Sequence, residues 1–190
     1  MQTPPATVLR LDPHALTVLA HPLRSRLVTA LRTDGPATAT TLARALSTNS
    51  GATSYHLRKL ASVSLVEETD DGHGRERWWR ATTSSHGWNE RDVEGHPDGQ
   101  AASDWLRRHY LDWFVENYAR WLDNQASWPL EWRDVGGAND YGLRLSPERL
   151  TAFVSEFERL VEAYRGHAGE PGEETLQVYL YAFPLAEKPS

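Results

Sequence analysis

The stretch Asn49–Leu60 reads Asn-Ser-Gly-Ala-Thr-Ser-Tyr-His-Leu-Arg-Lys-Leu. It predicts one helix with two different faces. Asn49 is a good N-cap, because its side chain can accept a hydrogen bond from a free backbone N–H of the first turn. An inward stripe at helical spacing consists of Ala52, Thr53, Leu57 and Leu60. A short polar helix with small hydroxyl groups at its N-terminal end fits a DNA major groove.

The outward face of this helix carries the predicted DNA contacts. Its hydroxyl, imidazole and guanidinium groups are expected to read base edges, Lys59 is expected to bind phosphate, and Gly51 leaves room for close backbone approach. The alternative is a face that is simply solvated, which is common for polar helices. The predicted DNA-binding residues of the helix are Ser50, Gly51, Ser54, Tyr55, His56, Arg58 and Lys59.

The flanking segments favour the DNA interpretation. Thr38–Leu46 is predicted to form a short capped helix, and Ser47-Thr48 a tight turn, which is the spacing of a helix-turn-helix. Two predicted strands, 65–68 and 75–82, form a hairpin around the glycine turn at 72–74, and Trp79 is expected to be buried. Arg75 and Arg77 near its tip are expected to hold phosphates or enter a minor groove. This arrangement predicts a winged helix.

Over residues 11–82 the chain resembles the ArsR-type winged-helix repressors, in the branch with a helical C-terminal extension. The resemblance rests on the order and spacing of Ala20-His21-Pro22-Leu23-Arg24, Leu42-Ala43, Ser54-Tyr55-His56-Leu57-Arg58-Lys59-Leu60, Leu65-Val66 and Gly74-Arg75-Glu76-Arg77. It implies a DNA-binding repressor. Two features depart from the family pattern. Ser64 stands where a glycine usually closes the recognition helix, so either this serine adopts a left-handed conformation or the turn differs. The chain has no cysteine, so the family's thiolate metal site is absent.

The charge is distributed unevenly along the chain. Residues 1–80 carry 10 Lys and Arg against 7 Asp and Glu, whereas residues 81–190 carry 10 against 19, for a net charge of −6. Only the first part can therefore lie along phosphates, and the acidic part is expected to face away from DNA.

The expected fold is mostly α with small β. Residues 1–83 are predicted to form the winged helix-turn-helix DNA-binding domain, 84–100 a polar linker rich in Gly, Ser, His and Pro, and 101–190 an α+β dimerisation and effector domain. Asp12-Pro13 and Pro22 are predicted helix starts. The second domain is expected to contain two long helices, 104–123 and one capped by Ser146, and two strands, 140–145 and 176–183.

The helix predicted at 104–123 is apolar over more than half of its circumference. One neighbour cannot cover so wide a face, so we expect a symmetric homodimer through this half of the chain. The alternative is that this helix is the centre of the C-terminal domain. Six of the eight tryptophans also lie in the second half, which suggests either a pocket for a small organic effector or a dense aromatic core. The predicted pocket walls are Trp105, Trp113, Trp121, Trp128, Trp132 and Tyr141.

Enzymatic and metal chemistry find little support in the sequence. His109, Asp112 and Glu116 share one helix face, but Arg108 and Arg120 lie at salt-bridge spacing and explain both carboxylates, so no metal is expected. The sequence contains no glycine-rich phosphate loop, nucleophile elbow or paired-histidine zinc motif, and no cofactor is expected. It contains no apolar run of membrane-spanning length, so we expect a soluble cytoplasmic protein.

The function predicted from the sequence is that of a sequence-specific, DNA-binding transcriptional regulator. It is expected to be a dimeric repressor that binds a double-stranded operator and is released by a small effector. The alternative is a winged-helix module that binds another protein and does not bind DNA.

Overall fold

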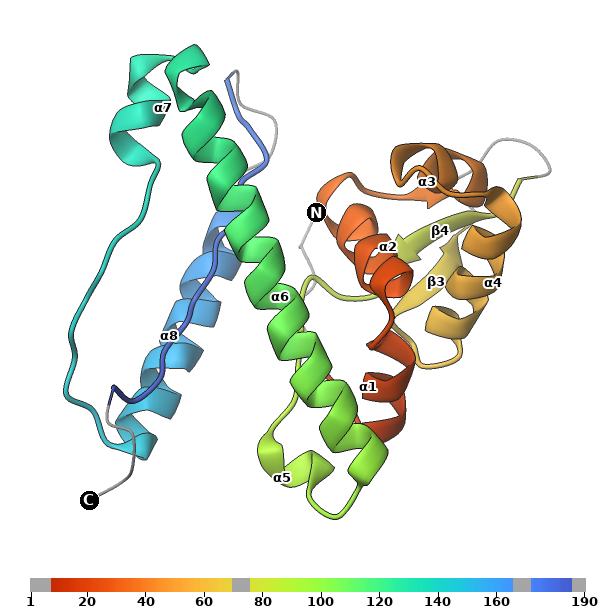
Figure 1. Cartoon of the computed structure of the whole chain (residues 1–190), viewed down its shortest axis with the longest axis horizontal. Coiled ribbons are helices and arrows are strands. Elements are labelled where there is room, and N and C mark those ends of the chain that lie inside the picture. Colours follow the sequence, from red (N-terminus) through yellow and green to blue (C-terminus); the bar gives the residue numbers. More distant parts are fainter. Residues whose placement is uncertain (1–7, 70–75, 166–171, 186–190) are drawn as a thin grey trace. The chain divides into compact units, whose positions relative to one another are not determined.

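The computed structural model describes residues 8–69, 76–165 and 172–185, and these residues fall into two compact units divided between Asp112 and Trp113 (Figure 1). The chain is mostly helical with small sheets, as predicted. No helix among the described residues is long and apolar enough to span a membrane.

Four helices at the start of the first unit follow the predicted starts. They are α1 (Pro13–Leu19), α2 (Pro22–Thr33), α3 (Ala39–Ala45) and α4 (Ser50–Ala61). Each is capped by the side chain that precedes it. Asp12 accepts from the Ala15 N–H at 2.7 Å, and Asn49 accepts from the Ala52 N–H at 2.8 Å. Caps of this kind satisfy backbone donors that have no partner within the helix, so the local sequence determines where these helices begin.

The predicted hairpin is present and gains a third strand in the described part of the chain. Strand β4 (Trp78–Ala81) lies between β2 (Ala37–Thr38) and β3 (Val66–Thr69), and both pairings are antiparallel. The ring of Trp79 is buried, as predicted, in a core that includes Leu16, Leu27, Leu57 and Leu60. The sheet and α4 therefore share one core, which sets the position of the recognition helix relative to the wing.

Two serines adopt left-handed backbone conformations at the turns around α4. Ser64, after α4, has φ 58°, so of the two alternatives at this position the serine takes the left-handed conformation. Ser47, between α3 and α4, has φ 52°, and the Thr48 N–H donates to the Ala43 carbonyl at 2.8 Å. Non-glycine residues rarely occupy this region, so both turns are defined by the packing around them.

The segment 84–100, predicted to be a linker, is folded onto the first unit. It contains β5 (His86–Gly87), which pairs in parallel with β1 (Leu9–Arg10), helix α5 (Glu90–Val93), and the beginning of α6 (Pro97–Asn124). Val93 is fully buried in the core. Helix α6 begins seven residues before the predicted start at Asp104. The division into compact units also lies beyond residue 100, because the first turns of α6 pack in the core through Ala102 and Leu106.

Three polar side chains hold this segment in place. One guanidinium nitrogen of Arg32 lies 2.6 Å from His86 Nδ1, and His86 Nε2 lies 2.8 Å from the Tyr110 hydroxyl. Because arginine only donates, Nδ1 must accept, and the imidazole proton resides on Nε2. Arg32 Nε also donates to the Thr83 carbonyl at 2.9 Å. The end of α2 is thereby joined to the segment after the wing and to α6.

This network makes the stability of the fold sensitive to acid. Burial and, second, the Arg32 charge lower the pKa of His86 to about 3. Because the folded pKa lies below the unfolded value near 6.5, the unfolded chain binds the proton first, and stability is lost as the pH falls below 6.5. We expect the free energy of unfolding to drop by about 2 kcal/mol between pH 6.5 and pH 5 from this group.

Urea denaturation of the wild type and of His86→Gln at both pH values measures this loss. Glutamine can accept from Arg32 but does not titrate. The free energy of unfolding of His86→Gln should therefore fall less between pH 6.5 and pH 5 than that of the wild type, by the contribution of His86. Equal pH dependence in the two chains would contradict this role for His86.

The second unit contains the remainder of α6, the 3-10 turn Gln125–Ser127, α7 (Leu130–Val135) and α8 (Pro147–Arg165). The predicted cap of α8 is present, since Ser146 Oγ accepts from the Arg149 N–H at 3.3 Å. The two strands predicted at 140–145 and 176–183 are wrong, because neither segment has regular secondary structure or pairs in a sheet. Alternating apolar residues are not sufficient for a strand, which also needs a neighbour to pair with.

Candidate nucleic-acid interface

Helix α4 has the two faces predicted from its sequence. Thr53, Leu57 and Leu60 are fully buried, and the Thr53 hydroxyl donates to the Asn49 carbonyl at 3.0 Å. The opposite face is open to solvent within the first unit, and its exposed residues are Ser50, Gly51, Tyr55, Arg58 and Lys59. Ser54 is partly buried. The scaffold therefore presents a polar helix face of the size and chemistry that a major groove accepts.

Two long side chains on this face, Tyr55 and Lys59, lie next to each other. The Tyr55 side chain is 49% exposed, and the Lys59 ammonium lies 5.9 Å from the centre of its ring. This contact orients Lys59 without burying its charge. Arg58 is exposed one residue before it, at the border with the wing. The hydroxyl and cationic groups of α4 thus lie together on one surface.

His56 differs from its neighbours because it faces α2. Its Nδ1 accepts from Arg24 Nε at 3.3 Å, and the centre of its ring lies 4.4 Å from the centre of the His21 ring. Arg24 also donates to the Val18 carbonyl. Burial lowers the pKa of His56 and, with a smaller contribution from Arg24, of His21. A neutral, partly buried imidazole that already accepts from Arg24 is suited to docking α4 on α2, which the sequence pattern did not indicate.

The wing contributes Arg77, which is held by a neighbouring carboxylate. Arg77 donates to Glu68 at 2.8 Å, and Arg80 donates to Glu67 at 2.7 Å. Arg75, the other predicted wing contact, and the glycine turn at 72–74 lie outside the described residues. Sequence reasoning missed the two glutamates as partners, because their pairing depends on the strand register.

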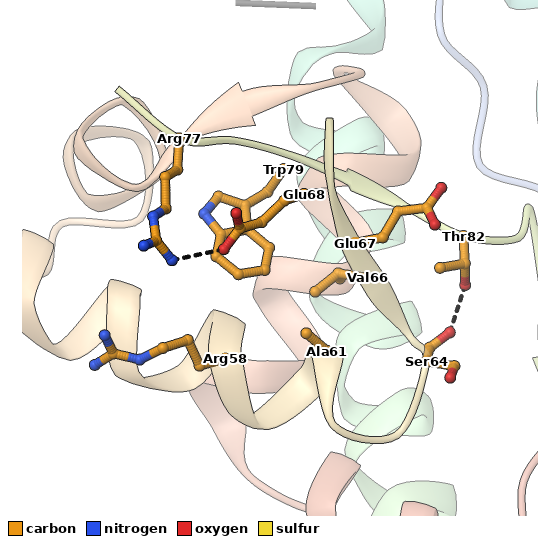
Figure 2. Close-up of a pocket in the computed structure, with 9 residues that line it drawn as sticks. All are labelled: Arg58, Ala61, Ser64, Val66, Glu67, Glu68, Arg77, Trp79 and Thr82. Carbon is orange, nitrogen blue, oxygen red and sulfur yellow. Dashed lines mark hydrogen bonds and ion pairs between the residues drawn. The ribbon is translucent and has the colours of Figure 1, made fainter. Parts of the chain in front are cut away.

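A hollow of about 370 Å³ lies between α4 and the wing (Figure 2). Val66, Trp79 and Ala61 form its apolar part, and Arg58 and Arg77 lie along its rim. In Figure 2 the Arg77 guanidinium extends toward Glu68, and the Arg58 side chain runs along α4 on the same side of the hairpin. The structure therefore brings together one cation from the recognition helix and one from the wing.

The predicted effector residues are only partly brought together. In the second unit the ring centres of Trp121 and Trp128 lie 5.9 Å apart, and those of Trp128 and Trp132 lie 6.1 Å apart. Trp105 instead belongs to the first unit and stacks on His109 at 4.7 Å. Trp113 is partly buried, whereas Tyr141 is 77% exposed. Three of the six residues thus form one aromatic cluster.

The polar triad considered for metal binding has no metal-site geometry in the described ranges. Asp112 and Glu116 are exposed, whereas His109 stacks on Trp105. Among residues 8–69, 76–165 and 172–185, no group of three His, Asp or Glu side chains is placed to hold an ion.

Comparisons with known proteins identify one domain of the chain. A family model described as a helix-turn-helix domain matches residues 19–69. A solved structure described as a possible transcriptional regulator for arsenical resistance is 30% identical, with a TM-score of 0.33, over 55% of this chain and 95% of its own. A search of the curated proteins found no match.

Two further solved structures are more distant. A homodimeric winged helix-turn-helix DNA-binding domain from Mycobacterium bovis, a possible ArsR-family transcriptional regulator, is 22% identical, with a TM-score of 0.32, over 48% of this chain and 76% of its own. The adhesin competence repressor of Streptococcus pyogenes is 16% identical, with a TM-score of 0.34, over 75% of this chain and 82% of its own.

Proposed function

This chain belongs to the ArsR-type winged helix-turn-helix regulators, and we propose that it binds an operator in double-stranded DNA as a homodimer and represses transcription. The observation that carries the proposal is the exposed polar face of α4, whose opposite face is fixed in the core by Thr53, Leu57 and Leu60. A helix held in this way can enter the major groove without rearrangement.

The proposed contacts divide into two kinds. Ser50, Ser54, Tyr55 and Arg58 read base edges, while Lys59 and the wing arginines bind phosphates or the minor groove. Gly51 permits close approach of the helix backbone, since it carries no Cβ. His56 supports the readout indirectly, because its hydrogen bond with Arg24 fixes α4 against α2. Arg58 is the most direct reader, since arginine can bond both acceptors of a guanine.

The charge distribution supports this orientation. Residues 1–80 have 10 cationic against 7 acidic side chains, and residues 81–190 have 10 against 19. Phosphates attract the first part and repel the second. We propose that the acidic part carries dimerisation and a small organic effector site near Trp121, Trp128 and Trp132. An effector there would release DNA by favouring a dimer with the wrong separation of recognition helices.

A gel-shift titration tests whether the chain binds DNA and prefers one sequence. The full chain is used to select duplexes from a random-sequence pool, and the selected duplex is compared with random DNA at increasing salt. We expect a preferred duplex and a binding constant that falls steeply with salt. Absence of binding even at low salt would overturn the DNA-binding proposal and favour the protein-interaction module.

Two neighbouring cations on α4 are expected to differ in what they recognise. Arg58→Ala should weaken binding to the selected duplex by about 1–3 kcal/mol, mostly through one base position. Lys59→Ala should weaken selected and random duplexes alike and reduce the salt slope by about one unit. Titrations of both variants on both duplexes make the comparison. Equal losses on the two duplexes for Arg58→Ala would contradict its role in base readout.

A further inference from the structure

The wing carries two ion pairs that face opposite sides of the hairpin. Glu67 lies opposite Arg80 in the strand register, and Glu68 lies opposite Trp79. Because successive side chains of a strand alternate between faces, Glu68 shares its face with Val66 and Trp79, whereas Glu67 points to the other face. The two glutamates are therefore similar in chemistry but different in location.

Both members of the Glu68 pair lie beside the recognition helix. Glu68, Arg77 and Trp79 line the hollow whose other wall carries Arg58, whereas Glu67 reaches this hollow without its partner Arg80. In Figure 2 the Glu67 carboxylate points away from Arg58 and Arg77, whereas the Glu68 carboxylate is joined to Arg77. A carboxylate is thus paired with one of the two cations at this hollow that the proposed function assigns to DNA.

We propose that Glu68 sets the discrimination of this interface between operator and random DNA. The inference rests on the proposed function. By occupying Arg77, Glu68 removes one cation from the surface that meets phosphates, and its own charge repels them. Arg77 therefore adds little affinity through a contact with backbone phosphates, which DNA of any sequence would offer.

The exposure of the pair decides how strongly it acts. The side chains of Arg77 and Glu68 are 68% and 49% exposed, and ion pairs of this kind change an equilibrium by about fivefold or less. The pair can therefore open when a bound duplex offers Arg77 a better site, such as a narrow minor groove. Only certain base sequences form a groove of that shape, whereas every duplex offers phosphates. The ion pair consequently penalises random DNA more than an operator.

Glutamine replacements of the two glutamates test this inference. Glu68→Gln should bind random duplex about three- to fivefold more tightly than the wild type, with a salt slope steeper by about one unit. Its affinity for the selected duplex should change less, so the ratio of the two affinities should fall. Glu67→Gln is the matched control, because it removes the same charge from the opposite face, and it should stay within about twofold of the wild type on both duplexes.

The outcomes separate this inference from the proposed function. Wild-type chain that binds no duplex would overturn both. If the wild type binds but the two variants gain equally on random DNA, the effect is one of net charge, and the inference is wrong. If Glu68→Gln leaves the affinity ratio unchanged, it is also wrong. Thermal melting of both variants checks that the hairpin remains folded.

Discussion

Replacing Arg32 with methionine is expected to lower the free energy of unfolding by about 3 kcal/mol. Methionine retains much of the aliphatic packing but cannot donate to the Thr83 carbonyl or to His86 Nδ1, which Arg32 reaches at 2.9 and 2.6 Å. Both acceptors would be left partly buried without this donor, and the cost of an unmet buried polar group exceeds the net gain from making the bond.

Arg26→Met is the matched control for this prediction. Arg26 is on the same helix but exposed, and its bond to the Leu46 carbonyl is long, at 3.4 Å. Its loss should cost less than about 0.5 kcal/mol. Urea denaturation at neutral pH measures both variants. A loss for Arg32→Met no larger than for Arg26→Met would show that the network does not hold the segment after the wing.

The two variants also separate stability from DNA binding. Arg32 lies at the end of α2 and donates to Thr83 and His86 in the segment after the wing, which is not part of the exposed face of α4. At a temperature where both chains remain folded, Arg32→Met should therefore bind the selected duplex as the wild type does. This comparison distinguishes loss of the fold from loss of the interface.

The helix starts and the recognition helix could be predicted because their signals are local. Asp12, Thr38 and Asn49 each cap the helix that follows them in sequence, and the spacing of Leu57 and Leu60 within α4 defines its buried face. The unusual turn at Ser64 could be located for the same reason, since it depends on where α4 ends, although its left-handed conformation was one of two alternatives.

The features that the sequence did not reveal depend on contacts between distant residues. The segment 84–100 has the composition of a linker, yet it is held by Arg32, fifty-four positions before His86. The ion pair of Glu68 with Arg77 depends on strand register. His56 shares the polar spacing of its neighbours, but the position of α2 turns it away from the exposed face. Segments 140–145 and 176–183 have alternating apolar residues but do not pair in a sheet. Their residue pattern does not reveal whether a neighbouring strand is present.

The proposed dimer leads to the largest expected change in DNA affinity. Within the second unit, Phe114 lies 5.0 Å from Tyr179 between ring centres, and Asn117 donates to the Tyr179 hydroxyl at 3.1 Å. Val115 and Leu122, seven residues apart on α6, remain 55% and 47% exposed. A spacing of seven residues places both side chains on one stripe of the helix, which is the pattern through which helices pair.

Leu122→Glu is therefore expected to convert a dimer into a monomer and to lower affinity for a duplex with two half-sites by at least about 100-fold. The charge cannot be buried in a helix pair without a partner, and a monomer loses the gain from binding the second half-site within one complex. Sedimentation measures the oligomeric state, and a gel shift measures the affinity. Leu122→Met, which keeps an apolar side chain, should remain dimeric. A Leu122→Glu chain that is folded by circular dichroism, still dimeric and still able to bind tightly would place the dimer contact elsewhere. A wild-type chain that sediments as a monomer would overturn the dimer altogether.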